Sequence, residues 1–263
     1  MEILDAAILG AVQGVTEFLP ISSSGHLVLG ESILGLEVES LLSFDVAVHV
    51  GTLVAILAYF WRDFICLLRN KRLTVLLVVG TLPVVAIGFG LKDFFEGPAM
   101  RNSMSVGVFM ICVGILFLVA EWYGQRKKKK VPVSDLKWWN ALVIGLFQSV
   151  ALIPGVSRSG STISGGLING VKREEAARFS FLLGGVAIAG AAALIIYDQL
   201  GDIDVSAIGS PDFHPVLAGF LMSAVVGYFS IYWLMRFLKN HSLKWFAWYL
   251  FVVGGVSLGL SCF

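Results

Sequence analysis

The sequence predicts an all-α, polytopic membrane protein with six transmembrane helices and two re-entrant helix hairpins, arranged as an inverted-topology internal repeat. Three observations indicate this fold class. Of the 263 residues, 57% are hydrophobic and 14% are charged, whereas soluble domains carry about 25% charged residues. Six apolar runs are long enough to cross a bilayer as a helix, which takes about 17–25 residues. Two further apolar stretches are interrupted by proline, glycine and serine, and these two stretches resemble each other.

The elements follow one another in the same order in both halves of the chain. Residues 3–35 form an apolar stretch broken by PISSSG, and its second arm is too short to cross the membrane. Irregular backbone inside a bilayer is tolerated only where it is buried in protein or lines a cavity. We therefore expect a re-entrant hairpin here, followed by crossings at 44–61, 73–91 and 104–123. In the second half, a hairpin over 138–170 is broken by PGVSRSGS and precedes crossings at 179–197, 215–236 and 245–262.

The basic residues predict the orientation in the membrane. Most Lys and Arg residues gather in four loops, and cytoplasmic loops are the ones that carry such an excess. We place these loops in the cytoplasm: 62–72, 125–130, 171–178 and 239–244. Residues 198–213 contain four aspartates and no Lys or Arg, and we place them outside. The first hairpin then enters from outside and the second from the cytoplasm.

An internal repeat links the two halves. A shift of 135 residues aligns the broken stretches without a gap and gives nine identities over residues 10–35, among them Gly10 with Gly145 and Gln13 with Gln148. We expect one membrane domain over 1–263, made of a first repeat at 1–125 and a second at 136–263. Because each repeat has an odd number of crossings, the second copy is inverted. Inverted repeats with broken helices bring their loops together near the membrane midplane, where transporters often bind substrates.

Arg158 is the most informative residue of the second loop. An arginine at the membrane centre costs at least about 2.5–3.5 kcal/mol on insertion scales, so it needs an anionic partner. Its planar guanidinium suits phosphate or carboxylate. Glycines and hydroxyls beside a helix start favour an anion site, and we predict substrate binding by this group: Gly155, Ser157, Ser159, Gly160 and Thr162. The alternative is that Arg158 only pairs with Glu17 and locks the two hairpins together.

Gln13 and Glu17 lie four residues apart, hence on one face of a helix. A carboxylate one turn from an amide oxygen can share a hard divalent cation such as Mg²⁺ or Ca²⁺, with phosphate oxygens and water completing the shell. We predict this pair as the metal site. Helix capping or hydrogen bonding within the bundle is the alternative.

The first loop supplies the remaining candidates. His26 can transfer protons near neutral pH, and Ser23 is the preferred nucleophile if a neighbouring base activates it. We therefore predict Glu17, Ser23, His26 and Arg158 as catalytic residues. Ser22, Ser24 and Gly25 are predicted to bind substrate, although serines at a break also satisfy backbone donors. Asp45 is expected to cap a helix, with support of the site residues as the alternative, and His49 is expected to pack or to form a hydrogen bond within the bundle.

Two segments resemble a known family: QGVTEFLPISSSGH at 13–26 and PGVSRSGST at 154–162. They are similar to the motifs of the undecaprenyl-diphosphate phosphatases, the bacitracin-resistance family of bacterial membrane enzymes. FDVAVHVGTLVAILAYFWRD at 44–63 is a less specific match, and the resemblance covers the whole chain. Where Gln13 stands, the family pattern allows Glu or Gln.

The resemblance implies hydrolysis of a C55 polyprenyl diphosphate to the monophosphate, which recycles the cell-wall lipid carrier. It also implies a divalent cation, and a site built from Glu17, His26, Arg158 and the loop serines. Expected partners are the polyprenyl diphosphate, membrane lipid and a second copy in a homodimer, with no nucleic acid; the expected location is the bacterial cytoplasmic (inner) membrane. The rival class is a transporter or lipid flippase, which would share the inverted repeat and the broken helices.

Overall fold

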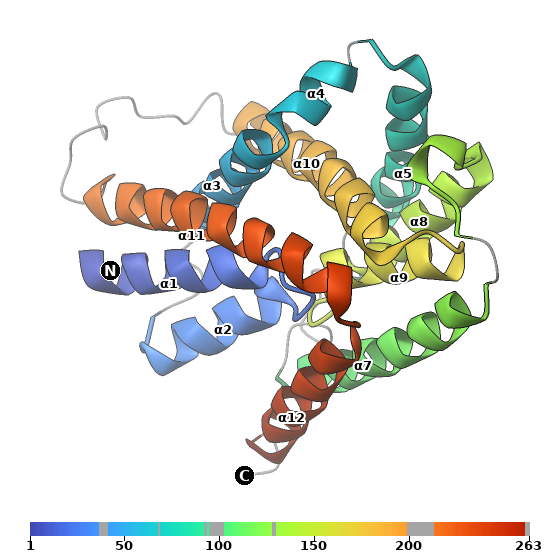
Figure 1. Cartoon of the computed structure of the whole chain (residues 1–263). Coiled ribbons are helices and arrows are strands. Elements are labelled where there is room, and N and C mark those ends of the chain that lie inside the picture. The colour runs from blue at the N-terminus through green and yellow to red at the C-terminus, as the bar shows by residue number, and fades with distance from the viewer. Residues whose placement is uncertain are drawn as a thin grey trace.

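The computed structural model describes residues 1–36, 42–67, 69–91, 94, 103–127, 130–198 and 213–260. In this part of the chain the backbone is helical apart from turns, a short 3₁₀ turn and an isolated bridge between Val131 and Val171. The helices are α1 (Ile3–Thr16), α2 (Ser23–Ile33), α3 (Leu42–Tyr59), α4 (Trp61–Leu67), α5 (Lys71–Gly90), α7 (Ser103–Arg126), α8 (Trp138–Val150), α9 (Arg158–Ile168), α10 (Arg173–Asp198), α11 (Phe213–Asn240) and α12 (Lys244–Leu260), with the 3₁₀ turn η2 at Val133–Asp135 (Figure 1).

The apolar helices make this a multi-pass membrane protein. Four of the described helices are long and apolar enough to cross a bilayer: α5, α7, α10 and α11. They match the predicted crossings at 73–91, 104–123, 179–197 and 215–236. The crossing at 44–61 falls on α3, which together with α4 would make a fifth span with a 79° bend. The crossing at 245–262 falls on α12, which has 17 residues; positions 261 and 262 lie outside the described residues, as do 199–212 of the predicted external loop.

Two of the predicted cytoplasmic loops are largely helical: 62–72, and 171–178, where α10 begins at Arg173. Residues 62–67, assigned to a cytoplasmic loop, belong to α4. Asp63 in the first turn of α4 favours a helix start, since carboxylates there interact well with the helix dipole. The same carboxylate pairs with Arg178 of α10, which ties α4 to the rest of the bundle.

The basic segments meet at one end of the bundle. Arg178 pairs with Asp63, and Lys239 Nζ lies 3.2 Å from Glu174 Oε1. Side chains of all four segments line two neighbouring clefts, of about 310 and 230 Å³. A common end for these segments is what the predicted orientation requires.

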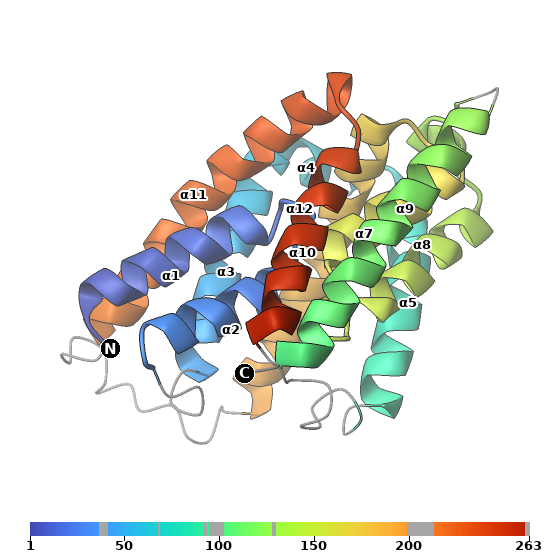
Figure 2. The same ribbon diagram turned by 90° about the horizontal axis from the view of Figure 1, so that it is seen from below.

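The helix bounds follow the repeat. Adding 135 to the bounds of α2 gives 158 and 168, which are the bounds of α9. The first and last residues of α1 become 138 and 151 in the same way, and α8 runs over Trp138–Val150. The helix packing also corresponds between the two halves: α1 lies along α11 in the same way that α8 lies along α5, and α7 packs against α12 (Figure 2). Each hairpin is therefore supported by a long helix from the other half.

Glycines make these helix crossings possible. A Cβ on Gly10 would overlap the carbonyl oxygen of Gly219, and a Cβ on Gly145 would overlap that of Gly80. Where α7 crosses α12, a Cβ on Gly107 would lie 2.9 Å from the Gly254 carbonyl oxygen. Small residues at such contacts let membrane helices approach closely, and dispersion and backbone contacts then hold them together.

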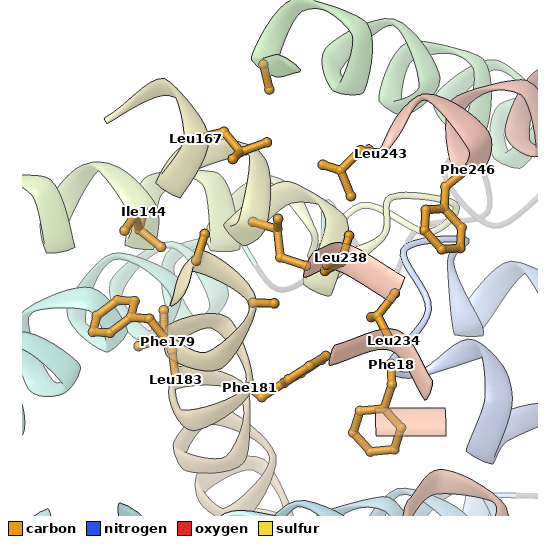
Figure 3. Packing of buried hydrophobic residues seen from close by; sticks show 14 of the residues in the cluster. Phe18, Ile144, Leu167, Phe179, Phe181, Leu183, Leu234, Leu238, Leu243 and Phe246 are labelled. Atoms are coloured by element: carbon orange, nitrogen blue, oxygen red, sulfur yellow. The ribbon is translucent and has the colours of Figure 1, made fainter. Parts of the chain in front are cut away.

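The main hydrophobic core lies where the two hairpins meet α10, α11 and α12. Figure 3 shows Phe18 of the first loop beside Phe181 of α10, with Leu234, Leu238 and Phe246 nearby. The rings of Phe18 and Phe181 are edge to face, with centroids 5.7 Å apart. These fully buried rings fix the end of α1 against α10, and this contact sets the position of the neighbouring Glu17.

Candidate active site

Proline ends the first arm of each hairpin. α1 ends at Thr16, four residues before Pro20, and α8 ends at Val150, four residues before Pro154. A proline has no N–H and its ring clashes with the carbonyl four residues earlier, which favours the end of each helix at this point. The loops then turn sharply: Ser22 has φ 71° and Gly155 has φ 89°. Both loops thus place a short polar segment between two apolar arms.

The two loops contact each other through Glu17 and Arg158. Glu17 caps the C-terminus of α1 and Arg158 is the first residue of α9. Arg158 Nη2 pairs with Glu17 Oε1. Nearby, the Ser159 hydroxyl donates to the Leu19 carbonyl at 3.4 Å, and a Cβ on Gly160 would lie 3.1 Å from Pro20 Cβ. The two loops therefore approach each other as predicted. The pairing of Arg158 with Glu17, which was the alternative considered for Arg158, is also present.

The second carboxylate oxygen of Glu17 collects several neighbours. The Ser23 hydroxyl donates to Oε2 at 2.7 Å, and the Gln13 amide donates to it at 3.2 Å. His49 Nε2 lies 4.0 Å from the same oxygen. Glu17 and Gln13 are both buried. One carboxylate therefore connects the guanidinium of the second loop with the serine of the first.

His26 lies in a separate hydrogen-bonded group. Its Nδ1 is 2.7 Å from the Ser22 carbonyl oxygen, and its Nε2 is 2.7 Å from the Tyr249 hydroxyl of α12. Because a carbonyl only accepts, Nδ1 carries the hydrogen and Nε2 accepts from the tyrosine. The rings of His26 and Tyr249 stack with centroids 5.8 Å apart. Among the described hydrogen bonds, none joins His26 to Ser23.

The hydroxyls of the second loop are buried and mostly used within it. Ser157 caps α9 by accepting from the Gly160 N–H at 3.1 Å, and its carbonyl accepts from the Ser161 N–H at 2.9 Å. Thr162 donates to the Arg158 carbonyl at 2.8 Å and also contacts the Ser180 hydroxyl. These bonds engage two of the N–H groups at the start of α9. Two donors at the start of α9 are buried with no hydrogen-bond partner, Arg158 Nη1 and the Ser161 hydroxyl, and these are left for an anion.

The predicted glycines pack against α7. A Cβ on Gly25 would meet Met110, one on Gly155 would lie 2.7 Å from the Val106 carbonyl oxygen, and one on Gly160 would overlap Phe117. Ser24 is exposed, whereas Ser22 is buried and its hydroxyl has no partner. Close approach to α7 is therefore a structural reason for glycine at these three positions, and substrate contact by them stays a prediction.

The residues around Glu17 fit a divalent cation. Within the described residues, no three His, Cys, Asp or Glu side chains gather to hold a metal ion. The Gln13 Oε1 is, however, a buried oxygen without a hydrogen-bond partner beside the Glu17 carboxylate. Carboxylate, amide oxygen and water suit Mg²⁺ and Ca²⁺, so Gln13 and Glu17 fit as part of such a site.

Comparison with known proteins places the chain in a family. The family described as bacitracin resistance protein BacA matches residues 6–256. The chain belongs to this family. The BacA-family relatives include the undecaprenyl-diphosphatase of Rubrobacter xylanophilus, 44% identical over 99% of this chain and 98% of that protein. Those of Methanosphaera stadtmanae and Carboxydothermus hydrogenoformans are each 40% identical, over 99% of this chain and 99% and 98% of their own lengths.

This BacA-family chain brings to its centre three residues that the motifs did not indicate. His49 was expected to pack or to form a hydrogen bond, and its Nδ1 does bond to the Asp45 carbonyl oxygen; its Nε2, however, faces Glu17. Tyr249 contacts His26, and Gly184 of α10 makes room for the Arg158 guanidinium. The repeat contained a signal for His49 and Gly184, because the shift of 135 residues aligns these two positions with each other. The same shift aligns Phe44 with Phe179, five residues earlier in each helix. The helix after each hairpin must therefore face the loops at corresponding positions.

Proposed function

We propose that this chain is a membrane phosphatase that hydrolyses undecaprenyl diphosphate to undecaprenyl phosphate and inorganic phosphate. Membership of the BacA family and the undecaprenyl-diphosphatase relatives support this activity. The activity would recycle the lipid carrier of the cell wall and give resistance to bacitracin. The structural observation that carries the proposal is the contact of Arg158 with Glu17, which also holds the Ser23 hydroxyl. A guanidinium, a carboxylate and a serine hydroxyl thus lie together inside the bundle.

Arg158 is proposed to bind the diphosphate. Phosphoryl transfer depends mainly on positioning and on neutralising phosphate oxygens. A diphosphate brings more negative charge than the single carboxylate of Glu17, so its oxygens compete for the guanidinium, which can hold phosphate through two parallel hydrogen bonds. The unpaired Nη1 of Arg158 supports this exchange. As the guanidinium turns to phosphate, Glu17 becomes a stronger proton acceptor.

Ser23 is proposed as the nucleophile and Glu17 as its base. The Ser23 hydroxyl already donates to Glu17 Oε2 at 2.7 Å, within the range expected for a general base. Ser23 Oγ attacks the terminal phosphorus, its proton passes to Glu17, and the bond from that phosphorus to the bridging oxygen breaks to release undecaprenyl phosphate. Water then cleaves the phosphoserine, which releases inorganic phosphate and restores the serine hydroxyl.

His26 is proposed to act in the second step. Its Nε2 accepts from Tyr249, so the imidazole becomes a base only once that bond opens. It would then take a proton from the attacking water. A divalent cation held by Glu17 and Gln13 would, when bound, neutralise charge on the phosphate oxygens.

The finer architecture is part of the proposal. We propose six crossings, two re-entrant hairpins and an inverted repeat in the bacterial cytoplasmic membrane. The coincidence of helix bounds after a shift of 135 supports the repeat, and the meeting of the basic segments at one end supports a common cytoplasmic face. Both ends of the second hairpin reach that end, since the Val131 N–H donates to the Gly170 carbonyl at 3.0 Å. Association into a homodimer stays a prediction.

The experiment is phosphate release by the purified full chain in detergent, from a C55 polyprenyl diphosphate labelled with ³²P in its terminal phosphate. Arg158→Lys loses the two-bond contact to phosphate, and we expect turnover to fall about 10²–10³-fold, as for the loss of one transition-state donor. Arg236→Lys is the matched control, because Arg236 stacks on Tyr232 of α11, and it should stay close to the unchanged protein. An unchanged protein that releases no phosphate would favour a transporter instead.

Rapid quenching separates the two possible nucleophiles. The unchanged protein should carry acid-stable ³²P during turnover, and Ser23→Ala should carry none and be nearly inactive. A Ser23→Ala variant that still turns over, with no labelled protein in either case, would assign the attack to water.

A further inference from the structure

We propose that His49 is a third protein ligand of the divalent cation, beside Glu17 and Gln13. The site would then combine an imidazole nitrogen with oxygen ligands and would hold transition-metal dications such as Mn²⁺ more tightly than Mg²⁺ or Ca²⁺. This inference deepens the proposed function, because it rests on the cation site at Glu17 and Gln13.

The first argument is the tautomer of His49. Its Nδ1 lies 2.7 Å from the backbone carbonyl oxygen of Asp45, one turn earlier on α3. A carbonyl oxygen can only accept, so Nδ1 carries the hydrogen and the lone pair of the neutral ring is on Nε2. Metal-binding histidines are usually held in this way, with one ring N–H on a backbone carbonyl and the other nitrogen on the metal.

The second argument is the distance between His49 Nε2 and Glu17 Oε2, which is 4.0 Å. A hydrogen bond between nitrogen and oxygen is about 2.7–3.2 Å long, so this contact is too long to be one. Two ligand atoms that each lie about 2.0–2.2 Å from one metal ion are separated by about 2.8–3.6 Å when the angle between them is about 90–110°. The observed spacing is a few tenths of an ångström longer, so His49 has to move by about that much toward Glu17 to share an ion with it. A lone pair and a carboxylate this close are favoured by an electropositive group between them, which a metal ion, a proton or the hydrogens of a bridging water can supply.

The third argument is the Gln13 amide. The Gln13 Nε2 donates to Glu17 Oε2 at 3.2 Å, and the Gln13 Oε1 is buried without a partner. A half-turn of the amide exchanges these two atoms and presents the oxygen to the side where Glu17 Oε2 and His49 Nε2 converge. Three donors then come from two helices, α1 and α3. The His49 side chain is partly exposed, which leaves room for phosphate oxygens and water in the remaining positions.

The repeat gives independent support. The position equivalent to His49 in the second half is Gly184, and a Cβ there would overlap the Arg158 guanidinium. Corresponding positions of α3 and α10 therefore both face the centre of the molecule. One supplies an imidazole beside the carboxylate, and the other supplies space beside the guanidinium. His26 offers no comparable nitrogen, because the Tyr249 hydroxyl lies 2.7 Å from its Nε2.

The test is Mn²⁺ binding to the purified full chain in lipid nanodiscs without substrate. Free Mn²⁺ is followed by continuous-wave electron paramagnetic resonance (EPR), and nitrogen coordination by pulsed EPR (electron spin-echo envelope modulation). We expect ¹⁴N modulation from one imidazole in the unchanged protein and its loss in His49→Gln. Mn²⁺ affinity should fall at least about tenfold, since even outer-shell partners of a metal ligand change affinity 10–100-fold. Mg²⁺ affinity, measured by competition, should change less.

His241→Gln is the matched control, because His241 is exposed and its Nδ1 lies 3.2 Å from the Phe237 carbonyl oxygen at the end of α11. It should keep the modulation and the affinity. Protein with ¹⁵N-histidine needs no substitution: the modulation should change from the ¹⁴N to the ¹⁵N pattern. Mn²⁺ bound without nitrogen modulation, or modulation that persists in His49→Gln, would overturn the proposal. Failure of Mn²⁺ to bind would also overturn it, whereas phosphate release, measured separately with Mg²⁺ and with a chelator, decides the phosphatase activity itself.

Discussion

Gly184 offers a way to move Arg158 without changing it. A Cβ built on Gly184 would overlap Arg158 Nη1, lie 2.5 Å from Cζ and lie 3.2 Å from Nη2. Ordinary van der Waals contact begins at 3.4 Å, so in Gly184→Ala Cζ of Arg158 has to retreat by about 1 Å and Nη1, which the new Cβ would overlap, by about twice as much. A misplacement of about 1 Å costs about 10²-fold in a positioned reaction. We therefore expect kcat/KM for polyprenyl diphosphate to fall about 100-fold, or about 2.7 kcal/mol.

The fold should tolerate this change. The atoms that must move are the far end of a flexible side chain, and alanine is about 0.8–1.0 kcal/mol better than glycine in a helix interior. The thermal midpoint in detergent should therefore stay close to that of the unchanged protein. Gly190→Ala is the matched control on the same helix, because a Cβ there meets nothing within 4 Å; its activity should be unchanged.

A double-mutant cycle tests the cause. If Gly184→Ala acts through Arg158, then adding it to Arg158→Lys should lower phosphate release little further, because the interaction has already been removed. Activity of Gly184→Ala within threefold of the unchanged protein would refute the reasoning. A full second loss in the double variant would show that the alanine acts elsewhere.

Three further substitutions test separate contacts. Glu17→Gln removes both the proposed base of Ser23 and the carboxylate of the cation site, so phosphate release should fall close to background with or without Mg²⁺; a variant that still turns over with unchanged Mg²⁺ stimulation would exclude Glu17 from both roles. Tyr249→Phe frees the His26 Nε2 and should leave turnover within about threefold, whereas a loss above tenfold would mean that the tyrosine holds the imidazole in its working position. Glu121→Gln breaks the buried pair with Arg173 and should lower the free energy of unfolding by about 3 kcal/mol, measured by denaturant unfolding in mixed micelles; an unchanged midpoint would contradict this.

The breaks in the hairpins were predictable because their cause is local. Pro20 and Pro154 each lack an N–H and clash with the carbonyl four residues earlier, and each is closely followed by serine and glycine; α5, which has no such cluster after Pro83, continues through its proline. The sequence at the bend between α3 and α4 contains no residue that interrupts a helix. Tyr59, Phe60 and Trp61 contain neither proline nor glycine, and Asp63 pairs with Arg178 of a distant helix. A bend stabilised by a contact between halves of the chain leaves no periodic signal in either segment.

The site residues were also predictable only where their positions depend on local sequence or on the repeat. The approach of the two broken stretches was predicted from their resemblance to each other, and the pair of Glu17 with Arg158 was the alternative considered for Arg158; the structure has both. The direction of His26 was not predictable. Ser23 and His26 lie three residues apart on α2, yet Ser23 at the helix start turns back to Glu17, whereas His26 turns to Tyr249 of α12. The direction of each side chain depends on which residue of a neighbouring segment lies opposite it. The spacing of Ser23 and His26 along α2 does not predict that residue.

Electrostatics explains why the two repeats differ at the centre and agree elsewhere. Gly10 and Gly145 occupy equivalent helix crossings, where both copies need the same close approach. At the centre, identical copies would place two like charges beside each other inside the bilayer, which disfavours the ionised form of both. A carboxylate at position 17 in one copy and a guanidinium at position 158 in the other form a neutral pair instead. A duplicated fold can therefore bury an ion pair able to bind a charged headgroup only if the central positions diverge, and His49 and Gly184 are divergent at equivalent positions beside that pair.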